Sequence, residues 1–190
     1  MPAAVTWAVA YIASGQSFAG SKLQYIPHAG VVMAGRGTNA FFHCAYAIAW
    51  QSSKTSDFDS LDSEMPAYLQ AVHGLLSAKA SVEEMQWLTV QEIYIVGFSI
   101  SLNRICCCRY SRRVNGEAFT RKVDDAFIGC WDASWGDPPW DISDAESMTA
   151  LARIQVTQDR RHHPHKSIGG RLLFAEVTRY SVRFTMGDEL

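Results

Sequence analysis

The chain has 190 residues, of which 48% are hydrophobic and 19% are charged. This length and composition suit one globular domain with a buried core and exclude an intrinsically disordered protein. The formal net charge is only −2, so no overall field attracts nucleic acid or an anionic membrane, and we expect neither as a partner. We treat residues 1–190 as a single domain.

Cysteine usage and the N-terminal sequence predict the compartment. The five cysteines are odd in number and three of them, 106–108, are adjacent, which does not fit a disulfide-stabilised secreted domain. The apolar run 5–13 lacks a preceding basic region and is shorter than the roughly 20 residues that cross a bilayer. We expect a cytoplasmic protein, or one carried within a viral particle.

The first part of the chain predicts three strands and a helix. Residues 5–12 form a continuous apolar run typical of a buried strand. Residues 22–26 alternate, and 31–34 are apolar again up to a glycine-rich stop. From Thr38 onward the apolar residues follow a helical period, and Thr38 or Asn39 can cap that helix.

The middle of the chain predicts a loop, a helix and a run of strands. Residues 52–62 are polar without a period and predict a surface loop. Ser63 is then expected to cap a helix that runs to about Ala80. Stretches rich in Ile, Val, Phe and Cys predict antiparallel strands, with Asn115-Gly116 as a hairpin turn, at 92–101, 105–110, 119–123 and 126–131.

The last third predicts one helix and a final pair of strands. Ser143 and Glu146 form a capping box ahead of a helical period that ends before Pro164. Residues 172–177 and 182–185 have strand patterns. Two groups of strands separated by helices predict an α/β (α+β) fold, with two sheets covered by helical layers.

Three motifs occur in an order that suggests a known family. The segment 22–28 is followed by a strand and glycine stop at 31–37, and Ser167-Ile168-Gly169-Gly170 precedes the closing strands. Together with the acidic C-terminal residues 187–190, this order resembles the proteasome β-type family of N-terminal-nucleophile (Ntn) hydrolases. The resemblance implies a four-layer α/β/β/α sandwich with two antiparallel sheets.

The resemblance also implies catalytic positions. In that family the mature chain begins with Thr, Ser or Cys, whose α-amine acts as base for its own side chain, beside a lysine on a neighbouring strand. Lys22 matches that lysine, and Ser167 matches a late serine that orients the amine. Residue 1 here is Met, the stretch before Lys22 is about one strand shorter than the family pattern, and no acidic residue precedes Asp57. We therefore expect a pseudoenzyme without a cofactor.

Two other residue groups have a structural interpretation. The histidine-rich segment 162–165 could bind a metal, but Pro164 interrupts helical pairing and we expect an exposed polar loop and no metal. The adjacent cysteines 106–108 cannot converge on one ion, because neighbours on a strand point to opposite faces. Cys44 follows the apolar stripe of its helix, and we expect it in the core.

Three functions are compatible with these features. The first is a non-catalytic proteasome-like subunit with a structural or assembly role, as a homo-oligomer or with partner proteins, in a ring or a viral particle. The second is an active threonine/serine-type peptidase or amidase, formed by processing or using an internal nucleophile such as Cys44 or Ser21. The third is a binding module that uses the basic segment 160–166 and the tryptophan-rich segment 131–140. We favour the first.

Overall fold

A computed structural model describes residues 6–12, 23–52, 55–112, 117–124, 144–162 and 171–190. No helix among them is long and apolar enough to cross a membrane. Their elements, in chain order, are β1 (Thr6–Ile12), β2 (Leu23–Ile26), the 3-10 helix η1 (Pro27–Ala29), β3 (Val31–Arg36), α1 (Asn39–Gln51), α2 (Phe58–Ser77), α3 (Val82–Trp87), β4 (Gln91–Ser99), β5 (Arg104–Arg112), β6 (Thr120–Asp124), α4 (Ala145–His162), β7 (Arg171–Val177) and β8 (Val182–Glu189).

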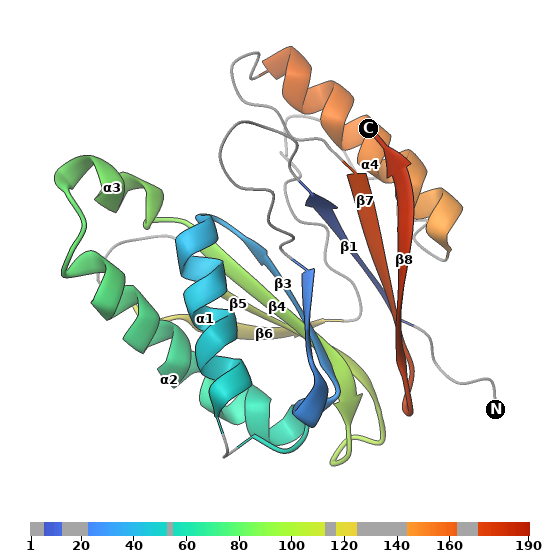
Figure 1. The fold of residues 1–190 in the computed structure, drawn as a ribbon, viewed down its shortest axis with the longest axis horizontal. Coiled ribbons are helices and arrows are strands. Elements are labelled where there is room, and N and C mark those ends of the chain that lie inside the picture. The colour runs from blue at the N-terminus through green and yellow to red at the C-terminus, as the bar shows by residue number, and fades with distance from the viewer. Residues whose placement is uncertain (1–5, 13–22, 53–54, 113–116, 125–143, 163–170) are drawn as a thin grey trace.

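The strands form two antiparallel sheets (Figure 1). One sheet has five strands in the order β2-β3-β4-β5-β6, and the other has three in the order β1-β7-β8. Every neighbouring pair is antiparallel. The predicted α+β class is confirmed, while the strand predicted at 126–131 lies outside the described residues.

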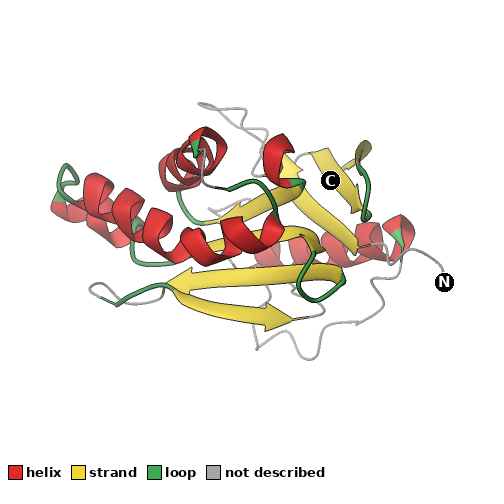
Figure 2. Ribbon diagram, turned by 90° about the horizontal axis from the view of Figure 1, so that it is seen from below, coloured by secondary structure: helices red, strands yellow, loops and turns green. Residues whose placement is uncertain are grey.

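One face of the five-stranded sheet packs against α1 and α2 (Figure 2). Side chains alternate along β3, so that Val31 and Met33 point towards these helices and Val32 points to the opposite face. The largest buried side chains from the two helices on this side are Phe41, Phe42, Phe58, Leu61, Met65 and Leu69. This interface is the main hydrophobic core of the described residues.

The three-stranded sheet contacts different layers on its two faces. Along β7, Ala175 and Val177 pack towards the five-stranded sheet. Leu172 and Phe174 point the other way and pack against Met148 and Ala152 of α4. The two-residue alternation of one buried strand therefore joins α4 on one side to the five-stranded sheet on the other.

The start of α1 was predicted correctly, and the start of α2 was not. The Thr38 hydroxyl accepts the Phe41 N–H at 3.2 Å and caps α1. Helix α2 begins after Asp57, not at Ser63, because the Asp57 carboxylate accepts the Ser60 N–H at 2.8 Å in a capping box. The loop predicted at 52–62 is therefore wrong over its second half.

Three further elements differ from the expectation. Helix α3 was not predicted; the Ser81 hydroxyl accepts the Glu84 N–H at its start. At the start of α4 the Asp144 carboxylate accepts the Ser147 N–H at 2.8 Å, whereas the predicted cap, Ser143, lies outside the described residues. Strand β8 continues to Glu189, beyond the predicted end at residue 185.

Gly97 and Gly74 provide a matched test of this packing. A Cβ atom at Gly97 of β4 would lie 2.7 Å from Cδ2 of Phe58 and 2.9 Å from Cγ2 of Val31, whereas one at Gly74 of α2 meets nothing within 4 Å. We expect Gly97→Ala to lower the free energy of unfolding by about 1–3 kcal/mol, because it overpacks the core. Gly74→Ala should raise it by up to about 1 kcal/mol, since alanine favours a helix. Denaturant titration measures both, and equal effects would contradict the packing of α2 on β4.

Candidate functional site

Both residues matched to the family's catalytic set, Lys22 and Ser167, lie outside the described residues. Their sequence neighbours can be placed. Lys22 directly precedes Leu23, which begins β2 and lies opposite Ala34 near the end of β3. Ser167 lies four residues before Arg171, which begins β7 opposite Ile12 of β1. The structure thus fixes the strand ends next to the two positions.

A cluster of polar side chains occupies the end of the five-stranded sheet beside Leu23. It consists of Arg36, Glu92 and Tyr94, and we call it the Glu92 cluster. Arg36 and Glu92 are direct partners across β3 and β4, and Tyr94 lies opposite Ala34. The Tyr94 hydroxyl donates to Oε2 of Glu92 at 2.9 Å, and Nη1 of Arg36 lies 3.6 Å from the same oxygen.

Burial makes the Glu92 carboxylate the unusual member of this cluster. Glu92 is 4% exposed, whereas the Arg36 side chain is 47% exposed. A buried carboxylate normally needs a cation or hydrogen-bond donors, and both are present here. The arrangement can hold a fixed negative charge at a sheet end, but it contains no group that is positioned to attack a carbonyl. Glu92 is not among the site residues predicted from the sequence, although a lone acid two residues from a tyrosine in an apolar strand was a usable signal.

The start of β1 lies away from the Glu92 cluster. Thr6 pairs with Val177, next to the β7–β8 turn. In that turn the Arg179 guanidinium lies 4.7 Å from the ring centre of Phe98. Phe98 is four residues beyond Tyr94 along β4, a separation of about 13 Å in a strand. Figure 1 shows the same arrangement, with β1 entering its sheet near the β7–β8 turn and β3 ending beside the start of α1.

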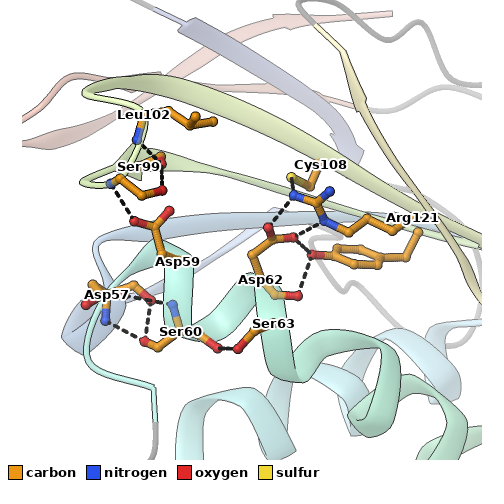
Figure 3. A network of polar contacts seen from close by, with 11 residues as sticks. Asp57, Asp59, Ser60, Asp62, Ser63, Ser99, Leu102, Cys108 and Arg121 are labelled. Carbon is orange, nitrogen blue, oxygen red and sulfur yellow. Dashed lines mark hydrogen bonds and ion pairs between the residues drawn. The ribbon is translucent and has the colours of Figure 1, made fainter.

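A second polar network lies under α2 (Figure 3). Asp62 of α2 accepts a hydrogen bond from the Tyr110 hydroxyl of β5 and forms an ion pair with Arg121 of β6. Nε of Arg121 donates to Oδ1 of Asp62 at 2.7 Å, and Nη2 of Arg121 lies 3.5 Å from Sγ of Cys108. These four residues, the Asp62 network, connect one helix to two neighbouring strands.

Burial and charge set the protonation of the Asp62 network. Burial acts to raise the pKa of Asp62, but hydrogen bonds from Arg121 and Tyr110, with the charge of Arg121, lower it below the usual value. Burial, with the Asp62 charge, raises the pKa of Cys108 to about 12. The same causes raise the pKa of Tyr110, which is 0% exposed. The thiol and the phenol therefore stay protonated at neutral pH and are poor nucleophiles.

The cysteines only partly follow the prediction. Cys106 and Cys108 are buried on the helix side of β5, and Cys107 packs towards the three-stranded sheet, so the expected alternation is confirmed. Cys44 is exposed on α1, and the prediction that it lies in the core is wrong. The buried residues of that helix, Phe41, Phe42, Ala45 and Ala49, define its core face. At about 100° per residue, Cys44 falls roughly 115° from the centre of that face.

The remaining candidate segments lie mostly beyond the described part of the chain. This holds for Ser21, for residues 131–140 and for 163–166. Arg160 and Arg161 are exposed near the end of α4. Within the described ranges, no group of three or more His, Cys, Asp or Glu side chains could hold a metal ion.

The Asp62 network makes a testable contribution to stability. We expect Asp62→Asn to lower the free energy of unfolding at pH 7 by about 2 kcal/mol, because the charged hydrogen bonds to Arg121 and Tyr110 are weakened. The folded pKa lies below the unfolded value of about 3.9, so the carboxylate's contribution is present above that value. It is lost as pH falls through the folded pKa, and the difference between wild type and variant should shrink as pH falls below about 4.

The matched control for this variant is Asp188→Asn. Asp188 pairs with Arg153 at 2.7 Å, but both side chains are largely exposed, so the substitution should leave stability almost unchanged. Urea titrations across the pH range give the comparison. If both variants behaved alike, the Asp62 network would not stabilise the fold.

Comparison with known proteins adds one finding on the fold. No family model matches the chain, and no curated protein matches its sequence. Among solved structures, Anbu from Hyphomicrobium sp. strain MC1 is similar, with a TM-score of 0.53 and 11% sequence identity. The alignment covers 95% of this chain and 87% of that chain. At this identity the likeness shows a shared fold over nearly the whole chain and nothing about activity.

Proposed function

We propose that this chain is a non-catalytic protein of the proteasome β-type Ntn-hydrolase fold that acts as a structural or assembly subunit. In this role it is part of a ring or of a larger particle such as a viral one. The observation that carries the proposal is the strand register, which sets Thr6 at the start of β1 opposite Val177, and Leu23, the residue after Lys22, opposite Ala34.

The fold supports the proposed likeness to the proteasome β-type Ntn hydrolases. The chain shares its fold with Anbu from Hyphomicrobium sp. strain MC1 over 95% of its length. Helices α1 and α2, the five-stranded sheet, the three-stranded sheet and α4 contact one another in that order. A four-layer α/β/β/α sandwich accounts for this order of contacts. It also agrees with the resemblance in the segments around Lys22 and Ser167.

The register and direction of the strands support the proposal that the chain is non-catalytic. The family mechanism needs the nucleophile at the chain start beside the lysine. Here Thr6 begins β1 by the β7–β8 turn, while Leu23, the residue after Lys22, lies at the Glu92 cluster. Among the described residues, β1 thus begins opposite Val177 and not at the Leu23–Ala34 pair.

The alternative is an active peptidase or amidase with an internal nucleophile. The exposure of Cys44 makes this residue accessible to a substrate. His43 directly precedes Cys44 on the helix, and adjacent helical residues do not face each other, so it is poorly placed to serve as the base. Cys44 therefore accounts for simple thiol reactivity more readily than for catalysis.

Covalent labelling tests whether the chain is catalytic. The purified protein is treated with a peptide vinyl sulfone and a peptide epoxyketone, and the intact mass is recorded before and after. We expect no adduct with Cys44→Ser, and with wild type at most a slow adduct at Cys44. A stoichiometric adduct on Cys44→Ser that disappears in Cys44→Ser with Lys22→Ala would contradict the proposal, because it would show a nucleophile that depends on the family lysine.

A further inference from the structure

Strand β8 is an open edge of the three-stranded sheet. It follows β7 at the end of the order β1-β7-β8, and no described strand pairs with its outer side. Every second residue of an edge strand points its N–H and C=O groups away from the sheet, where they can pair with another strand. At eight residues, β8 is long for an edge.

The side chains of β8 leave its apolar face uncovered. Phe184 and Met186 lie opposite Ala175 and Leu173 of β7, so they share the face that turns towards the five-stranded sheet. They are nevertheless 39% and 52% exposed. Tyr25 of β2 and Phe184 form a T-shaped ring contact, with 6.3 Å between ring centres. An exposed apolar edge strand is normally avoided unless another chain covers it.

The charges along β8 are complementary to those of a second β8 strand that runs in the opposite direction. Arg179 and Arg183 lie at or before the start of the strand, and Asp188 and Glu189 lie at its end. Arg183 is paired with Glu176, and Asp188 with Arg153. Arg179 and Glu189 form no ion pair with a described residue. Two copies of β8 aligned antiparallel would bring the basic end of each against the acidic end of the other.

The register shift between β7 and β8 limits the part of β8 that can pair regularly with a second copy. It falls between the partners of Arg171 and Leu173, beyond Met186. Such a bulge bends a strand and ends regular pairing. The straight part is therefore 182–186, with Phe184 at its centre.

The geometry points to an interface in which β8 of one copy pairs antiparallel with β8 of a second copy about a twofold axis at Phe184. Each Phe184 then faces its counterpart, and each Val182 faces the partner's Met186, on one apolar face. The two three-stranded sheets become one sheet of six strands. Such a contact is isologous, because the same patch is used on both copies. The inference rests on the proposed assembly role and names the surface that performs it.

Sedimentation velocity over a wide concentration range tests the interface. We expect wild type to dimerise and Phe184→Lys to raise the dimer dissociation constant at least tenfold, since a charge on the inward face of an edge strand opposes pairing. Leu75→Lys is the matched control, because Leu75 is an exposed apolar residue on α2, and it should leave the constant unchanged. Thermal melts establish that both variants are folded.

Disulfide trapping provides a second measurement that does not depend on loss of binding. Opposite residues of an antiparallel pair have Cα atoms about 4.5–5.5 Å apart, within the range of a disulfide. In a Cys44→Ser background, Phe184→Cys should form a covalent dimer on mild oxidation and revert with reductant. Val82→Cys, on exposed α3, should not.

The outcomes separate the interface from the assembly role. A wild-type oligomer that resists Phe184→Lys and gives no Phe184→Cys dimer would overturn the interface and leave the assembly role standing. A wild-type monomer at every concentration, with no trapped dimer, would overturn both. Loss of association only with Phe184→Lys, together with trapping, is the expected result.

Discussion

The contact between the two sheets determines where the strand ends lie, and the proposed function depends on those positions. It is made by a small apolar cluster of Leu23, Val32, Val96, Ala175 and Val177. Because these side chains alternate with those that face the helices, the cluster sets both the distance between the sheets and the direction in which their strands run. The relative position of the β1 start, the β2 start and the β7–β8 turn follows from it.

Helix placement was largely predictable, and the errors at the start of α2 and at Cys44 have different causes. The helical period from Thr38 was strong enough to locate α1 and its cap. The start of α2 was missed because polar residues surround Phe58 and Leu61, so the core positions there looked like part of a loop. The prediction for Cys44 is wrong because its i, i+3 spacing from Phe41 does not by itself place it on the buried face of the helix. The core face of α1 is centred between Phe41 and Phe42, on the other side of Phe41 from Cys44.

The candidate site was less predictable than the fold. Motif order located Lys22 and Ser167 in the sequence, but a motif carries no information on which strand ends meet in space. That information comes from the register of Leu23 with Ala34 and of Thr6 with Val177. Long-range packing decides these contacts, so the exposed face of β8 could be recognised only in three dimensions.

The separation of the β1 start from the β2 start is the central claim, and backbone nuclear Overhauser contacts in isotope-labelled protein test it most directly. We predict cross-strand contacts between Thr6 and Val177 and between Leu23 and Ala34, with none from Thr6 to Leu23 or Ala34. Contacts from Thr6 to Leu23 or Ala34 would contradict this prediction, since they would place the start of β1 at the strand end where Leu23 lies.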